Sequence, residues 1–138
     1  MNEELESLAE EFRGSPYWGL LGIELKELEV GYAKTQLLIQ PSLLNVNKGL
    51  HGGVYASILD STMGVASRSL GFDRAVTLQM NIQFLGAVEQ GVIYAEAKVV
   101  HQTTSTVLVE GKLFDQYENL LAYSTATFKM FANKKETS

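Results

Sequence analysis

One stretch of the sequence, residues 45–60, constrains the possible folds more than any other. A polar loop passes through two consecutive glycines into an apolar segment rich in alanine, serine and glycine. In that segment Val54, Ile58 and Val65 recur at helical spacing. The pattern predicts a helix over about residues 53–70 with one apolar face.

Two positions in this stretch are candidates for chemistry. Asp60 interrupts the apolar pattern, and a carboxylate on such a helix is expensive to bury unless it is paired. Its structural alternative is a buried, hydrogen-bonded carboxylate that fixes the register of a dimer. Gly52 stands at the helix start, where the first N–H groups lack partners and carry partial positive charge. Its N–H could stabilise an oxyanion, although glycine there also suits the backbone geometry.

The length of the helix between Gly52 and Asp60 keeps these two groups apart within one chain. His51 and Asp60 are nine positions apart (60 − 51), which is roughly 13 Å on a helix. Asp60 therefore cannot act on a carbonyl held at the Gly52 amide of the same chain. A second copy of the helix, running antiparallel, would bring the groups together, and the small side chains permit that approach. If both groups are catalytic, the site is shared between two subunits, most simply in a two-fold dimer.

The spacing Asn45-x5-His51-Gly52-Gly53-x6-Asp60 resembles that of the hotdog-fold acyl-CoA thioesterases of the phenylacetate-degradation (PaaI-like) type. Residues 77–84 and 120–128 resemble that family's next strand and its last strand, so that the resemblance covers about residues 15–132. It implies an α+β hotdog fold, in which a curved antiparallel sheet wraps around the central helix. It also implies a homodimer whose sheets join, and often a dimer of dimers.

The resemblance further implies roles for individual residues. Asp60 would serve as general base for a water or as nucleophile towards the thioester carbonyl. The Gly52 amide and the Asn45 side chain would contact the carbonyl oxygen, and Asn47 is a competing candidate. In that family the carboxylate comes from one subunit, and the asparagine, histidine and glycine come from the other. As a structural alternative, Asn45 would cap the loop.

Two further residues complete the implied site. His51 would orient the substrate or the water, and its structural alternative is a histidine that holds the loop. Thr77 would orient the hydrolytic water beside the carboxylate through its hydroxyl, or it is an ordinary strand threonine. No cofactor is implied, because coenzyme A is part of the substrate. The basic residues that relatives often carry at the fourth strand are replaced here by Thr103-Thr-Ser-Thr106, so no residue is assigned to the coenzyme A phosphates.

Composition excludes several other classes of protein. The chain contains no cysteine, which rules out disulfides and thiolate chemistry, and two histidines make a histidine-rich zinc centre a poor fit. A net charge of −5 without a basic stripe argues against nucleic-acid binding. The acidic N-terminus does not resemble a signal peptide, and no apolar run approaches about 20 residues, so we expect a cytoplasmic protein that does not span a membrane.

The remaining pattern predicts one domain over residues 1–138. A short amphipathic helix over residues 2–13 precedes an apolar segment, residues 17–22, that either covers the core or walls an acyl pocket. Gly31 and Gly71 mark a hairpin turn and the end of the central helix. A polar tail over about 133–138 is expected to be disordered. The predicted strands cover residues 23–30, 32–40, 75–85, 91–102, 104–115 and 120–131.

The leading hypothesis is an acyl-CoA thioesterase whose acyl group is aryl or medium-chain. One alternative is a non-catalytic acyl-CoA-binding or sensor protein on the same fold. Another is a hotdog hydratase or dehydratase of hydroxyacyl thioesters. Four apolar residues are candidates to shape the acyl pocket: Trp18, Leu21, Met63 and Phe84.

Overall fold

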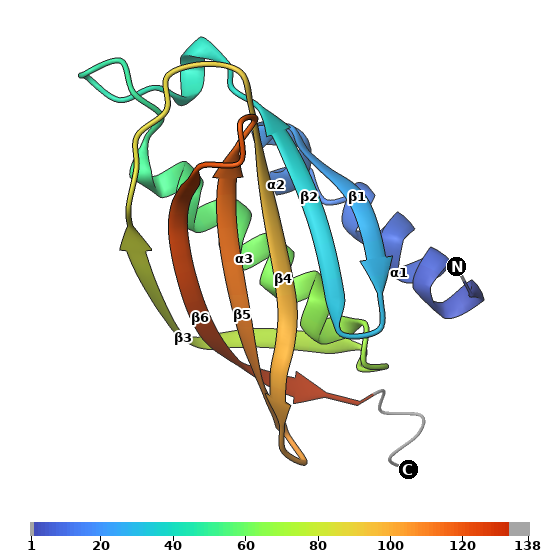
Figure 1. Cartoon of the computed structure of the whole chain (residues 1–138). Coiled ribbons are helices and arrows are strands. Elements are labelled where there is room, and N and C mark those ends of the chain that lie inside the picture. The colour runs from blue at the N-terminus through green and yellow to red at the C-terminus, as the bar shows by residue number, and fades with distance from the viewer. Residues whose placement is uncertain (1, 133–138) are drawn as a thin grey trace.

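A six-stranded antiparallel sheet curves around the central helix α3 (Gly52–Arg68) (Figure 1). The computed structural model describes residues 2–132, so the predicted disordered tail lies outside the described residues. The strand order is β1-β2-β4-β5-β6-β3. The strands are β1 (Ile23–Glu29), β2 (Tyr32–Leu38), β3 (Arg74–Phe84), β4 (Val92–Gln102), β5 (Thr106–Asp115) and β6 (Leu120–Phe131). The predicted α+β hotdog architecture, with its curved sheet around one long helix, is confirmed.

The predicted strands are all present, and their ends differ from the prediction by no more than two residues. β5 begins at Thr106 rather than at residue 104, because the preceding residues form a turn. In that turn the Thr103 N–H donates to the Thr106 carbonyl, and the Thr106 N–H donates to the Thr103 hydroxyl. The central helix begins at Gly52 and ends at Arg68, and Gly71, the glycine predicted to mark its end, follows three residues later with φ +104°.

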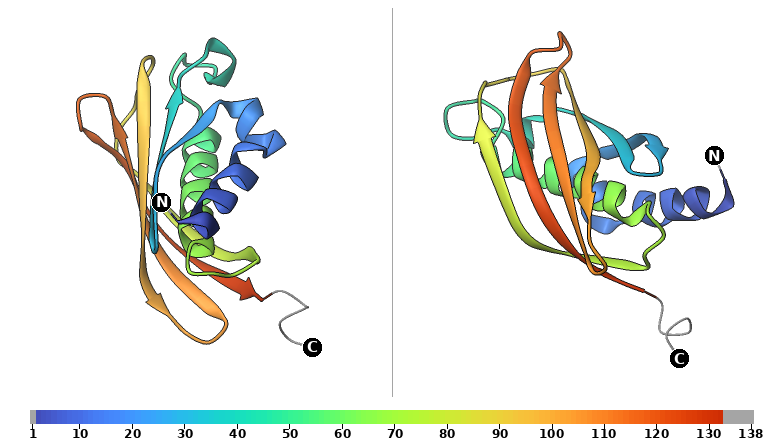
Figure 2. Two further views of the ribbon diagram at one scale, coloured as in Figure 1. Left: turned by 90° about the vertical axis from the view of Figure 1, so that its right-hand side faces the viewer. Right: turned by 60° about the horizontal axis from the view of Figure 1, so that its bottom comes forward.

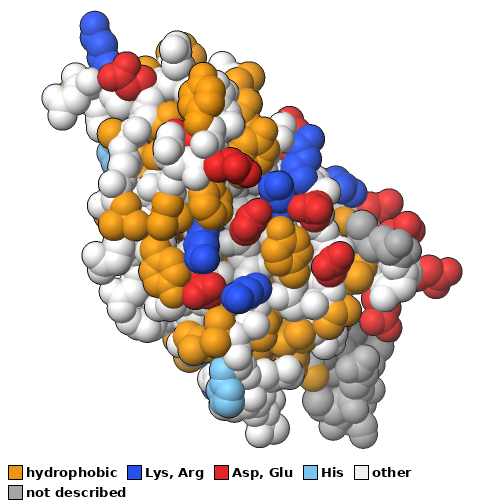
Figure 3. Space-filling model, in the orientation of Figure 1, with side chains coloured by type: hydrophobic (Ala, Val, Ile, Leu, Met, Phe, Trp, Pro, Cys, Tyr) orange, Lys and Arg blue, Asp and Glu red, His pale blue; other side chains and the backbone are white. Residues whose placement is uncertain are grey.

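Side chains along the strands alternate between the core and the outer surface of the sheet. On β4, Ile93, Ala95 and Ala97 are buried against α3, whereas the residues between them face outward. The outer face of the sheet carries interspersed lysine, glutamate and apolar side chains (Figure 3). One ion pair on this face joins Lys34 to Glu27 at 3.9 Å. The period of two in the sequence therefore reflects one buried and one solvated face.

The predicted apolar face of α3 packs on the sheet, with Val54, Ile58 and Val65 all buried. Met63 has 0% exposure, so the expectation that it shapes an acyl pocket is wrong. A Cβ added at Gly111 of β5 would lie 3.0 Å from the Met63 sulfur. This glycine therefore allows the helix and the sheet to approach closely around the methionine side chain.

Two short helices cover the side of α3 that the sheet leaves open (Figure 2, left). α1 (Glu3–Arg13) is capped by Asn2, whose Oδ1 accepts the Leu5 N–H at 2.8 Å. α2 (Pro16–Leu21) arises from the apolar segment and buries Trp18 to 3% exposure. The Trp18 and Phe12 rings are 5.4 Å apart. Within residues 2–132, no helix has the length and apolar character to cross a membrane.

In the part of the chain that the structure describes, β3 lies at the edge of the sheet and pairs with β6 alone. A bulge at Leu78 shifts its register, because Thr77 pairs with Phe128 and Gln79 with Thr127. An inserted residue moves the following side chains to the opposite face. The residues of β3 that face α3 are therefore Ala75 and Thr77 before the bulge, and Met80, Ile82 and Phe84 after it.

Candidate active site

Asp60 and Thr77 meet between the middle of α3 and the edge strand β3. The Thr77 Oγ1 hydroxyl donates to Asp60 Oδ1 at 2.8 Å. No other hydrogen bond or ion pair among the described residues engages the Asp60 carboxylate. One carboxylate oxygen is thus oriented by the threonine, and the other is free to contact a water or a substrate carbon.

Two surface hollows share Asp60, Ser61 and Thr77 as their common boundary. The first, here named the Trp18 hollow, has a volume of ≈ 230 Å³. Besides the shared residues, it is bordered by three aromatic residues, two small ones and two arginines: Phe12, Trp18, Phe128, Gly64, Ala75, Arg68 and Arg74. The second, here named the Tyr17 hollow, runs over the small-residue face of α3 towards Met80. A substrate group in either hollow would therefore lie against Asp60.

Tyr17 and Ser57 form the wall of the Tyr17 hollow. Ser57 Oγ donates to the Gly53 carbonyl at 2.8 Å, so it accepts the phenol hydrogen of Tyr17 at 2.5 Å. The sequence analysis missed this pair, since the two residues are 40 positions apart and neither belongs to a periodic pattern. It fixes the start of α2 over the second turn of α3.

His51 and Gly52 form the start of α3, at the opposite end of the helix from Arg68. His51 is the N-cap, and its Nδ1 accepts the Gly53 N–H at 2.7 Å. A neutral His51 ring therefore carries its proton on Nε2. Within residues 2–132, no hydrogen bond uses the Gly52 N–H. The Gly52 amide is therefore an available donor at the positive end of the helix.

Asn45 organises the loop that precedes the helix. Its Oδ1 accepts the backbone N–H groups of Asn47 and Gly49 at 2.9 and 3.1 Å. Asn45 thus caps the loop, as its structural alternative predicts. Its side-chain carbonyl is occupied, and its NH₂ group remains as a donor. Asn47 is exposed, whereas Asn45 is partly buried and held in the loop by two hydrogen bonds.

A single chain does not bring all five candidates together. Asp60 lies eight positions after Gly52 on α3 (60 − 52), about 12 Å along the axis. Asp60 and Thr77 form one cluster, and Asn45, His51 and Gly52 belong to the other. Phe84 lies beside Gly52, where an added Cβ would be 3.4 Å from its ring. Of the pocket candidates, Trp18 alone lines a hollow that touches Asp60.

The chain resembles known proteins along most of its length. Residues 47–122 match the Thioesterase superfamily. A 1,4-dihydroxy-2-naphthoyl-CoA hydrolase from Listeria monocytogenes is 30% identical over 117 residues, covering 83% of this chain and 95% of that protein. The acyl-coenzyme A thioesterase PaaI from Escherichia coli is 28% identical over 103 residues, covering 74% of this chain and 73% of that protein.

Solved structures show the same fold. The PaaI protein of the Escherichia coli phenylacetic acid degradation operon superimposes with a TM-score of 0.89, at 23% identity and 94% coverage of both chains. A Streptococcus mutans protein, smu.793, solved with bound acetyl CoA, gives a TM-score of 0.77 at 27% identity, covering 80% of this chain and 90% of that one. Fold and sequence thus define a hydrolase of thioesters with a hotdog fold. Within that class, the chain belongs to the thioesterase superfamily and is PaaI-like.

Proposed function

We propose that the protein is an acyl-CoA thioesterase, which hydrolyses an aryl or medium-chain acyl-CoA to the carboxylate and free coenzyme A. The observation that carries the proposal is the Asp60 carboxylate, which has one oxygen held by Thr77 and the other free beside two hollows. The relatives named for acyl-CoA hydrolysis and the neighbour with bound acetyl CoA support this class of substrate. Coenzyme A enters as part of the substrate, and the proposed reaction uses no other cofactor.

The proposed site is shared between the subunits of a homodimer. An antiparallel partner helix would bring the partner's Gly52 amide opposite Asp60, across the small residues of α3. The unpaired edge of β3 supports this arrangement. Exposed edge strands commonly pair with another chain, and β3 exposes the apolar residues Val76 and Leu78. Joining two β3 edges would extend the sheet across the dimer.

Hydrolysis would follow one of two routes from this geometry. As a base, Asp60 removes a proton from a water whose oxygen attacks the thioester carbon. The carbon–sulfur bond then breaks, and the thiolate takes up the proton. As a nucleophile, Asp60 attacks the carbon itself, expels the thiolate and forms an anhydride that water cleaves. In both routes the partner's Gly52 N–H stabilises the carbonyl oxygen as it becomes negative.

The remaining residues position these groups. Thr77 orients the carboxylate and can accept a hydrogen bond from the attacking water through its oxygen. The Asn45 NH₂ group donates beside the same carbonyl oxygen as Gly52. His51 holds the start of the helix through Nδ1 and can donate to substrate through Nε2.

Measuring thiol release from a panel of acyl-CoAs tests this proposal against its rivals. We expect stoichiometric release of free thiol and carboxylate. A binding or sensor protein would bind acyl-CoA without releasing thiol. A hydratase or dehydratase would change the acyl group and leave the thioester intact, and either result would contradict thioester hydrolysis.

The β3 edge predicts a specific assembly defect. Leu78→Asp places a charge on the edge along which the proposed dimer would join. Leu78 is 56% exposed, so we expect the subunit to fold and the dimer to dissociate. Activity should fall at least about a hundredfold, because a separated subunit lacks the oxyanion donor that its partner supplies. Sedimentation and thiol release measure both effects.

Val100→Asp is the matched control for this variant. Val100 is 54% exposed and also lies at a bulge, but on the internal strand β4. It should therefore leave both mass and activity unchanged. A Leu78→Asp protein that stays dimeric and active would exclude the β3 edge as the interface.

A further inference from the structure

We propose that the Arg68–Glu11 ion pair closes the far end of the Trp18 hollow and sets the upper length of the acyl group, while Gly64 keeps the hollow open beside Asp60. The inference rests on the proposed acyl-CoA thioesterase function and deepens it. It assigns a specificity-determining role to Glu11, Gly64 and Arg68, which are not among the site residues that the resemblance implies.

The helix face that floors the hollow carries three residues at four-residue intervals. Asp60, Gly64 and Arg68 are at positions i, i+4 and i+8 of α3, so they lie along one face. This row runs about 12 Å along the helix axis. An acyl group whose carbonyl lies at Asp60 and that extends along the row would pass Gly64 and then meet Arg68.

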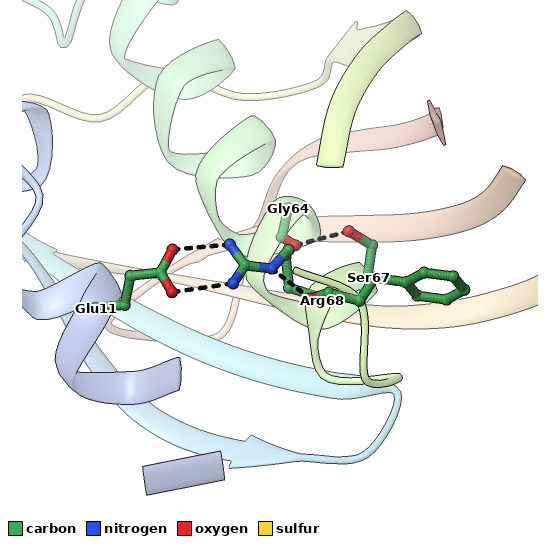
Figure 4. Close-up of polar contacts among 5 residues, drawn as sticks. Glu11, Gly64, Ser67 and Arg68 are labelled. Carbon is green, nitrogen blue, oxygen red and sulfur yellow. Dashed lines mark hydrogen bonds and ion pairs between the residues drawn. The ribbon is translucent and has the colours of Figure 1, made fainter. Parts of the chain in front are cut away.

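Packing against the neighbouring side chains does not require a glycine at position 64. A Cβ at this position would meet only Phe128, at an ordinary contact distance of 3.7 Å. A glycine in a helix interior makes the helix less stable than an alanine would. The Gly64 carbonyl, in the last turns of α3, accepts a hydrogen bond from the Ser67 hydroxyl at 2.7 Å (Figure 4). The missing side chain therefore widens the Trp18 hollow one turn beyond the carboxylate.

The end of the row is closed by a tightly held arginine. Arg68 donates to both Glu11 carboxylate oxygens, at 2.9 and 3.0 Å, and through Nε to the Phe72 carbonyl at 2.7 Å. Figure 4 shows this bidentate contact joining α3 to α1. The Arg68 side chain is only 12% exposed, and its hydrogen bonds lower the pKa of the Glu11 carboxyl, so the pair is ionised at neutral pH.

A second hollow begins on the other side of this pair. Arg68 lines both the Trp18 hollow and a larger hollow, of ≈ 400 Å³, beneath α1, which Glu11 also lines. Leu5, Leu8 and Phe72 are the apolar part of its lining, and the carboxylates of Glu3, Glu4, Glu11 and Asp73 also border it. Arg68 therefore borders both spaces, and we expect its removal to open one towards the other.

The volume of the Trp18 hollow indicates which acyl groups fit. A cavity of about 150 Å³ can hold benzene, so ≈ 230 Å³ accepts about one ring or a short chain. Phe12, Trp18 and Phe128 offer an apolar side to such a group, and Arg68 and Arg74 border the hollow as well. Longer chains would meet the ion pair and lose contact with the walls.

The test compares acyl chain length across variants of the full chain. The kcat/KM for thiol release is measured with butanoyl-, octanoyl-, dodecanoyl- and phenylacetyl-CoA. Binding of octyl- and dodecyl-CoA thioethers, which cannot be hydrolysed, is measured in parallel. We expect the wild-type protein to favour octanoyl and phenylacetyl over dodecanoyl groups.

Removing the ion pair should shift this preference. In Arg68→Ala the dodecanoyl-to-octanoyl ratio should rise at least about tenfold, since each buried methylene is worth about a factor of four. Glu11→Ala removes an exposed carboxylate and the hydrogen bonds that hold Arg68. It should raise the dodecanoyl-to-octanoyl ratio as well, but by less.

Gly64→Leu should lower the turnover of phenylacetyl-CoA and octanoyl-CoA at least about tenfold and leave the turnover of butanoyl-CoA unchanged. Arg13→Ala, on the same helix as Glu11, is the matched control and should keep the wild-type profile.

The outcomes separate this inference from the function on which it rests. Folded Arg68→Ala and Glu11→Ala proteins that hydrolyse acyl-CoAs with the wild-type length profile would overturn the ion pair as the limit. A length shift in thioether binding without thiol release from any variant would support the hollow and overturn the hydrolase. A wild-type protein that neither binds nor hydrolyses these compounds would overturn both.

Discussion

Asp60→Asn should lower thiol release from the best acyl-CoA substrate by about 10²–10⁴-fold, the contribution typical of a positioned acid or base. The amide is nearly isosteric with the carboxylate and can still accept the Thr77 hydroxyl hydrogen bond. It can neither take a proton from water nor attack the thioester carbon. We therefore expect lost turnover together with unchanged folding, unchanged oligomeric mass and retained binding of a CoA thioether.

Asp73→Asn provides the comparison for this variant. Asp73 is an exposed carboxylate just after the central helix and outside both hollows that touch Asp60. It should leave turnover at the wild-type level. Full activity in Asp60→Asn would mean that another group performs the chemistry.

Replacing Gly52 by proline should lower kcat by about 10²–10³-fold relative to replacing it by alanine, which is the effect of losing one oxyanion donor. Gly52 is the first residue of α3, a position where proline is well tolerated because the N–H has no helical partner. His51, with ψ 136°, already has the extended backbone that a residue before proline requires. Proline thus removes the N–H while the helix is retained.

Gly52→Ala separates the loss of the N–H donor from the addition of a Cβ. Both variants place a Cβ 3.4 Å from the Phe84 ring, and only the alanine keeps the amide hydrogen. Steady-state kinetics of the two proteins with one substrate gives the ratio of their kcat values directly. Equal kcat values in the alanine and proline variants would exclude the Gly52 amide as the oxyanion donor.

Much of the fold was predictable because local signals agree with the tertiary structure. The helical spacing of Val54, Ile58 and Val65 marks a face that is fully packed on the sheet. Gly31, with φ +81°, makes the predicted hairpin turn. Predictions failed where packing in three dimensions decides the outcome. Met63 belongs to the same helix as Asp60, but it faces Gly111, a residue far along the chain.

The candidate site was only partly predictable from sequence. The contact between Asp60 and Thr77 joins a helix and an edge strand, and the bulge at Leu78, which puts Thr77 and Met80 on the same face, breaks the period of two. The Arg68–Glu11 pair joins residues 57 positions apart and has no sequence pattern. The role of the Gly52 amide, which depends on a partner subunit, stays a prediction.

Heterodimer complementation tests the shared site most directly. Asp60→Asn and Gly52→Pro proteins are each expected to be nearly inactive. A purified dimer with one subunit of each kind combines an intact Asp60 from one subunit with an intact Gly52 from the other, so one of its two sites is complete. We predict about half of the wild-type kcat per dimer. A heterodimer as inactive as its parents would place both groups in the same subunit and contradict the shared site.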